Sequence, residues 1–185
     1  MIDVNELRKG TTFILGGELF KVLEYQHHKP GRGKATIRTT IRNLRTGANV
    51  QKNFISNDRV QDVRVEGRVV QYLYRDSDFC YFMDMETYEQ PMLGLSVLGE
   101  GIMYLKEGTE LKLLQYESET IDYELPTTVD MEVVESEMAV AGDTATGATK
   151  VLVLETGLKV RAPLFVNVGD VIRVDTRSGG YISRV

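Results

Sequence analysis

The chain has 185 residues, a net charge of −5, a pI near 5.2 and one cysteine, Cys80. A single cysteine excludes an intrachain disulfide and fits a reducing compartment. No apolar run approaches the length of a membrane-spanning helix, and the opening MIDVNE lacks the layout of a signal peptide. These features predict a soluble, cytoplasmic protein with no membrane partner.

The charge is unevenly distributed along the chain. Residues 1–64 carry +6 (12 basic against 6 acidic residues), residues 65–126 carry −9 (4 against 13), and residues 127–185 carry −2 (6 against 8). Basic surface is the electrostatic footprint of phosphate binding, so the first third predicts a nucleic-acid partner despite the acidic pI. The alternative is a basic segment that serves only solubility.

Apolar residues alternate with polar ones through most of the chain, which predicts strands. In the first third the expected strands are 11–15, 18–25, 35–42 and 50–55, with Gly16-Gly17 as a hairpin turn. The middle third predicts strands 69–74, 79–85, 111–116 and 121–125, and a short, interrupted helix within the glycine-containing stretch 93–105. The last third predicts strands 129–134, 151–155, 158–161, 171–174 and 181–185. Many short strands with regular turns indicate an all-β protein of three small barrels, with modules at 1–64, 65–126 and 127–185.

The loop HHKPGRGK at residues 27–34 is the strongest candidate binding feature. Gly31 and Gly33 permit a tight turn around Arg32, and Pro30 fixes its own φ, so a hairpin tip with one projecting cation is expected. In the strand that follows, residues of equal parity share a face, which places Arg38 and Arg42 together. Lys34 joins them if the strand extends that far. The shared face favours a ribbon that tracks phosphates over an ordinary exposed hairpin.

Catalytic and metal chemistry have no support in the sequence. His27 and His28 are neighbours that point to opposite strand faces, and no spacing completes a metal site. Nucleophile and nucleotide motifs are absent, and the carboxylates of 65–126 have no spacing typical of an acid–base pair. The aromatic residues of 72–82 could form a base-stacking platform, but their period of two favours core, and Cys80 is expected to be buried among them.

Several stretches resemble one known family over the whole length of the chain. They are YQHHKPGRGKA at 25–35, LRTG at 44–47, YLY at 72–74, METYEQ at 85–90, GDT at 142–144 and APLFVNVGDVIRVDTRSGGYISRV at 162–185. On these residues the chain is similar to bacterial translation elongation factor P. The last stretch is the most specific of the six.

The resemblance implies an L-shaped molecule with an SH3-like first barrel and two OB-like barrels, acting as a monomer without cofactor or metal. Its implied partners are the 70S ribosome, ribosomal RNA and peptidyl-tRNA. Such a factor binds between the peptidyl and exit sites and promotes peptide-bond formation at consecutive prolines by positioning the CCA end of peptidyl-tRNA.

The resemblance also implies site residues. Arg32 matches the tip that contacts the CCA end, and it is a candidate for rhamnosylation by a tip-modifying enzyme. The surrounding RNA-binding residues are Lys29, Pro30, Gly31, Gly33, Lys34, Arg38 and Arg42. A loop near the mRNA on the small subunit corresponds to Gly142, Asp143 and Thr144, and the activity-linked C-terminal residues correspond to Tyr181 and Arg184.

Two other functions stay open at the level of sequence. One is a general RNA-binding β-barrel protein with no ribosomal role, since OB folds commonly bind single strands. The other is a β-barrel enzyme with an acidic site in residues 65–126. Affinity for free oligonucleotides, and activity that survives removal of residues 1–64, would favour the first and the second respectively.

Overall fold

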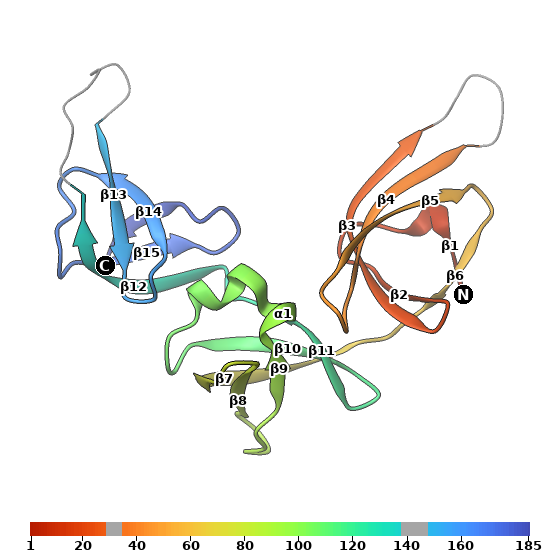
Figure 1. The fold of residues 1–185 in the computed structure, drawn as a ribbon, viewed down its shortest axis with the longest axis horizontal. Coiled ribbons are helices and arrows are strands. Elements are labelled where there is room, and N and C mark those ends of the chain that lie inside the picture. Colours follow the sequence, from red (N-terminus) through yellow and green to blue (C-terminus); the bar gives the residue numbers. More distant parts are fainter. Residues whose placement is uncertain (29–34, 138–147) are drawn as a thin grey trace.

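The computed structural model describes residues 1–28, 35–137 and 148–185. Their strands form three antiparallel sheets that follow one another along the chain, each made of consecutive strands. Figure 1 shows the first and last sheets at the two ends of a bent molecule and the middle sheet at the bend, in keeping with the predicted L shape. The prediction of a β protein in tandem modules is confirmed. The boundaries after residues 64 and 126 stay a prediction.

The first module is a six-stranded sheet in the order β1-β6-β2-β3-β4-β5. Its strands are β1 (Ile2–Asp3), β2 (Thr12–Leu15), β3 (Glu18–His28), β4 (Thr36–Asn43), β5 (Asn49–Ile55) and β6 (Arg59–Asp62), with the 3-10 helix η1 at Val4–Glu6. Gly16 and Gly17 have φ of 61° and 85°, as the predicted turn requires. Phe13, Val22, Ile37 and Phe54 belong to its buried core.

The middle module is a five-stranded sheet in the order β11-β10-β7-β8-β9. The strands are β7 (Glu66–Arg75), β8 (Phe79–Asp84), β9 (Met92–Gly94), β10 (Glu110–Tyr116) and β11 (Glu119–Glu124). The third module has the order β14-β13-β12-β15-β16. Its strands are β12 (Thr128–Ser136), β13 (Thr149–Leu154), β14 (Lys159–Pro163), β15 (Val171–Asp175) and β16 (Tyr181–Arg184).

The interrupted helix expected at 93–105 is present but begins later. Its first residues belong to β9; the α-helix α1 (Leu95–Leu98) and the 3-10 helix η2 (Gly99–Tyr104) follow. Gly99 takes a φ of 52°, which breaks the α-helix there. Tyr123 on β11 donates its hydroxyl to the Leu98 carbonyl at 2.6 Å, so the break is held by the sheet beneath it. We call residues 95–104 the helical segment.

The aromatic residues of 72–82 divide between core and surface. Tyr72 and Phe82 are buried, as predicted, and their rings meet edge to face at 5.8 Å. Cys80 is also buried, as predicted, and burial raises the pKa of its thiol to about 11. Tyr74 and Phe79 are exposed, so the prediction of core was wrong for these two. They lie near the end of β7 and at the start of β8, next to the turn that joins the two strands at the edge of the core.

The sequence produced no expectation for β1, β6 or β9. These strands have two to four residues each, too few for an alternation to stand out. Among the described residues, no helix is both long and apolar enough to cross a membrane.

Candidate nucleic-acid interface

The hairpin of β3 and β4 leads to the predicted tip. The two strands are paired as far as His28 and Thr36, and both histidines are exposed at that end. The tip residues themselves lie outside the described residues: Lys29, Pro30, Gly31, Arg32, Gly33 and Lys34. Within the described ranges, no cluster of His, Cys, Asp or Glu could hold a metal ion.

A row of polar side chains runs across β3, β4 and the neighbouring β5 on their exposed surface. Arg38 on β4 pairs in register with Gln26 on β3 and with Asn53 on β5, and all three are exposed. Together with Glu24, Gln51 and two threonines they line a shallow polar depression of about 210 Å³. The guanidinium and two amides supply donors of the kind that contact sugar and phosphate oxygens. Of the arginines predicted on this face, Arg38 is therefore exposed, and it lies in a depression that also contains the carboxylate of Glu24.

Arg42 has the predicted parity but a different environment. Its guanidinium crosses to the helical segment, where Nη2 donates to the carbonyls of Ser96 at 3.1 Å and Val97 at 2.6 Å. The last carbonyls of a helix lack intrahelical donors, so Arg42 satisfies groups that the short α1 leaves open. The two arginines therefore differ in environment: Arg38 is exposed to solvent, whereas Arg42 is hydrogen-bonded to the middle module. The predicted contact of Arg42 with RNA stays a prediction.

Several further contacts join the first and middle modules around Arg42. Lys21 on β3 forms an ion pair with Asp122 on β11, whose carboxylate is buried. Arg45 donates from Nη2 to Glu119 at 3.0 Å, an exposed pair that adds little stability by itself. Beneath them lies an apolar cluster formed by both modules: Leu19, Leu44, Val63 and Ile121. Burial of apolar side chains is the main source of stability in such a contact.

The contact between the middle and third modules uses the other end of the helical segment. Thr156 donates its hydroxyl to the Met103 carbonyl at 2.6 Å, and Tyr104 packs against the apolar core of the third module. Lys106 pairs with Glu155 at 3.2 Å. The helical segment therefore touches both neighbours of the middle module.

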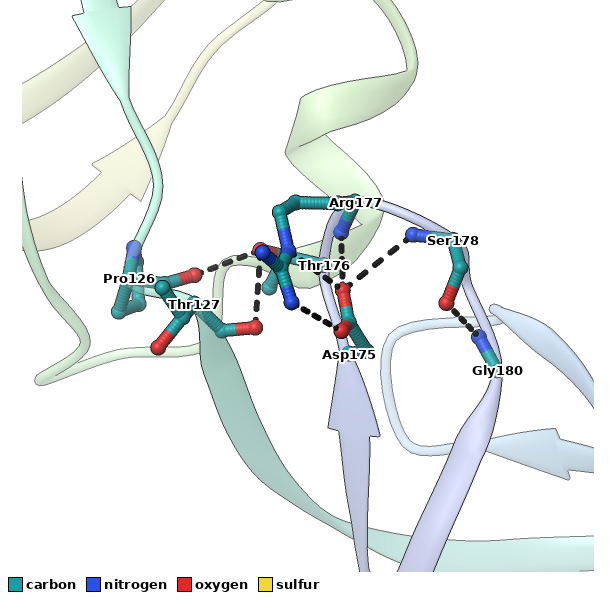
Figure 2. Close-up of polar contacts among 7 residues, drawn as sticks. All are labelled: Pro126, Thr127, Asp175, Thr176, Arg177, Ser178 and Gly180. Carbon is teal, nitrogen blue, oxygen red and sulfur yellow. Dashed lines mark hydrogen bonds and ion pairs between the residues drawn. The ribbon is translucent and has the colours of Figure 1, made fainter.

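A second contact with the third module is shown in Figure 2. Thr176 donates its hydroxyl to the carbonyl of Pro126 at 2.6 Å, where the chain passes from β11 to β12. Asp175 organises the turn around Thr176: it accepts from the backbone and the guanidinium of Arg177, the latter at 2.8 Å, and from the Ser178 backbone. Donation from Arg177 lowers the pKa of the Asp175 carboxyl to about 2.

The C-terminal candidates lie on the last strand. Tyr181 is half-buried against the core of the third module. Arg184 is exposed, with Nη1 3.7 Å from an Asp170 oxygen and its guanidinium 6.0 Å from the centre of the Phe165 ring. Gly142, Asp143 and Thr144 lie outside the described residues.

Sequence reasoning missed the residues that join the modules, among them Lys21, Asp122, Met103 and Thr156. Each contacts a partner 53 to 101 positions away in the chain. The one available signal was Asp122, a carboxylate between the apolar residues Ile121 and Tyr123 of a predicted strand. A buried carboxylate requires a partner, but the pattern does not say which cation supplies it.

Small β modules in tandem, with an exposed arginine among amide side chains on the first sheet and close contacts between neighbours, define a class of modular binding proteins. Comparison with known proteins identifies the members that this chain resembles. The Elongation factor P (EF-P) KOW-like domain matches residues 3–60, the Elongation factor P (EF-P) OB domain matches 65–123, and Elongation factor P, C-terminal matches 129–184.

Full-length relatives agree with these domain matches. Elongation factor P of Moorella thermoacetica is 47% identical over 184 residues, and those of Pelotomaculum thermopropionicum and Acetivibrio thermocellus are 45% and 44% identical over 185. Each match covers 100% of both chains. A solved eukaryotic translation initiation factor 5A from Methanococcus jannaschii covers 68% of this chain and 90% of its own at 24% identity, with a TM-score of 0.49. The chain belongs to the elongation factor P family, whose members are translation factors and not enzymes.

We predict that Arg42→Ala loosens the contact between the first and middle modules. The charge-assisted bonds to Ser96 and Val97 are worth about 2 kcal/mol, and their loss broadens the range of angles between the modules. Spin labels on cysteines introduced at positions 50 and 88 will report a wider distance distribution in Arg42→Ala. Arg38→Ala is the matched control, because Arg38 shares the strand and face of Arg42. Equal broadening in both variants would contradict the assignment.

We predict that Asp175 makes stability depend on pH in the acid range. Its pKa is lower in the folded than in the unfolded chain, so its contribution is complete above about pH 4 and is lost as the pH falls toward 2. Thermal unfolding of Asp175→Asn will therefore show a lower midpoint than the wild type at pH 7, and the difference will shrink between pH 4 and 2. A difference that is constant across this range would contradict the prediction.

Proposed function

We propose that this protein binds the 70S ribosome between the peptidyl and exit sites and promotes peptide-bond formation at consecutive prolines. It does so by positioning the CCA end of peptidyl-tRNA. The observation that carries the proposal is the full-length match to elongation factor P, together with an exposed Gln26–Arg38–Asn53 row across β3, β4 and β5.

The physical problem at proline is one of positioning. Proline has a fixed φ and a bulky secondary amine, so the reacting atoms seldom reach attack geometry. Small misplacements cost large factors in rate, and a protein that holds the CCA end in place recovers them. No proton transfer by the protein is required, which agrees with a translation factor that is not an enzyme.

Each module has a distinct part in this proposal. The first module, residues 1–64, contacts RNA through Arg38 and carries the tip residues Lys29, Pro30, Gly31, Gly33 and Lys34 around Arg32. The middle module, residues 65–126, carries the helical segment that touches both neighbours. The third module, residues 127–185, contacts the small subunit and its mRNA through Gly142, Asp143 and Thr144, supported by Tyr181 and Arg184.

The proposal also assigns separate roles to Arg32, Arg38 and Arg42. Arg32 contacts the CCA end, whereas Arg38 attracts phosphate along the exposed row. We assign Arg42 first to the contact with α1, since both Nη2 bonds go to that helix. Since its Nε is buried, RNA contact by Arg42 would then come only through Nη1.

We predict that Arg32→Ala abolishes rescue of a reporter with consecutive prolines, while ribosome affinity falls only modestly. Arg38→Gln instead weakens ribosome binding and makes its salt dependence shallower by about one unit of slope, because one phosphate contact is lost. Reporter translation and binding at several salt concentrations measure the two effects. Full rescue by Arg32→Ala would overturn the tip assignment. Affinity for a free RNA strand equal to that for ribosomes would favour a general RNA-binding protein.

We propose Arg32 as the site of rhamnosylation by a tip-modifying enzyme. Arginine at this position excludes a lysyl extension, and the resemblance matches it to the tip residue that carries rhamnose in some members. Intact mass spectrometry of protein from its native host should show the added mass of one deoxyhexose on the peptide that contains Arg32. An unmodified tip peptide would contradict this assignment.

A further inference from the structure

The outer surface of the middle sheet carries exposed aromatic and methionine side chains on adjacent strands. Tyr74 on β7, Tyr81 on β8 and Met92 on β9 lie in register across three strands. Beside them Gln71 pairs with Met83, and Met85 bonds to the Val69 carbonyl through its backbone. We call this surface the Tyr–Met face; its residues are Val69, Tyr74, Tyr81, Met83, Met85 and Met92.

Four of these six side chains are exposed, and Tyr81 and Met83 are half-buried between them. Tyr74 is 55% exposed, Met92 is 52% and Val69 is 47%, and none of the three belongs to a core cluster. A contiguous exposed apolar surface of this kind is typical of an interaction site. Methionine adapts its shape to a partner, which suits a surface that must bury an irregular segment.

The two tyrosines are held ready for contact. Their rings stack with centroids 4.7 Å apart and an interplanar angle of 22°. Tyr81 donates its hydroxyl to Asp76 at 2.8 Å, which fixes its ring, and Asp76 is fixed in turn by the backbone amides of Asp78 and Phe79. A preorganised aromatic pair loses little conformational freedom when a ligand binds.

The charged residues around the Tyr–Met face favour a basic partner. The middle module has a net charge of −9, and exposed carboxylates outnumber the two exposed cations beside the face, Arg75 and Lys112. The carboxylates lie in the turns at both ends of β8 and on β10: Asp76, Asp78, Glu86, Glu89 and Glu110. Next to the face, Phe79 and Met92 line a cleft of about 900 Å³ that also contains Asp78, Asp84, Glu89 and Glu119. Its two arginines, Arg45 and Arg68, are already paired with carboxylates. Phosphates would be repelled by this surface, whereas arginine and lysine side chains would be attracted.

We propose that the Tyr–Met face binds an arginine- and lysine-rich protein segment. Guanidinium groups of the segment stack on Tyr74 and pair with the surrounding carboxylates, and its apolar side chains pack against Met83, Met85 and Met92. This inference rests on the proposed function, since the segment is expected on a protein of the ribosome. It goes beyond that function because it assigns to the acidic middle module a protein contact of its own.

The test places a photoreactive p-benzoylphenylalanine at Met92 in the full-length chain. The chain is bound to purified, salt-washed 70S ribosomes carrying peptidyl-tRNA, and is irradiated. The expected result is an adduct that survives ribonuclease and contains a peptide rich in arginine and lysine. The same probe at Val134, an exposed position on β12, is the control and should not yield that peptide.

Tyr74→Ala in the probe-bearing chain should reduce the yield of the adduct about tenfold, as expected for an aromatic anchor of an interface. Tyr74→Phe keeps the ring and should restore the yield. Because Tyr74 lies outside the core clusters, circular dichroism should show both variants folded.

Three results would overturn the inference. They are an adduct that ribonuclease destroys, a yield no higher than at Val134, and a yield unchanged by Tyr74→Ala. Ribosome binding is measured in the same samples. Binding without the protein adduct defeats this inference and leaves the proposed function intact, whereas absence of binding defeats both.

Discussion

The geometry of this protein depends on ten residues of the middle module, the helical segment 95–104. One end accepts hydrogen bonds from Arg42 of the first module, and the other end accepts one from Thr156 of the third. Tyr123 holds the segment to its own sheet through the Leu98 carbonyl. Figure 1 shows the segment between the two outer modules. Because both neighbours bond to the same short element, its position controls how the ends of the molecule are oriented.

Close packing at this segment leaves little room for adjustment. Gly47 has a φ of 74°, and a Cβ there would lie 2.6 Å from the Ser96 carbonyl oxygen. Gly101 lies directly against Tyr123, so a side chain at that position would displace the ring. The two glycines permit backbone and ring to approach as they do. The positioning role proposed for this protein would require such rigidity, since small misplacements remove most of the gain in rate.

The first module is basic and the middle module is acidic, and their exposed surfaces differ accordingly in the partners that they suit. The first module presents Arg38 with amide side chains, a surface suited to sugar and phosphate. The middle module presents aromatic and methionine side chains among carboxylates, a surface suited to basic protein. Both follow from side chains that alternate along strands, so that one parity builds the core and the other reaches solvent. The side chains on the solvent face of each sheet can therefore differ between modules without changing the core.

The sequence by itself determined most of the strands and turns, the burial of Cys80 and the exposure of Arg38, because local alternation and turn chemistry encode these features. Its motifs also determined the family. Only the tertiary structure decided that Arg42 bonds to α1, that Lys21 pairs with Asp122, and that Tyr74 stacks on Tyr81 outside the core. The first two of these contacts join residues 55 and 101 positions apart. Periodicity specifies which face a side chain occupies but not which distant surface will meet that face, and that depends on how whole modules pack.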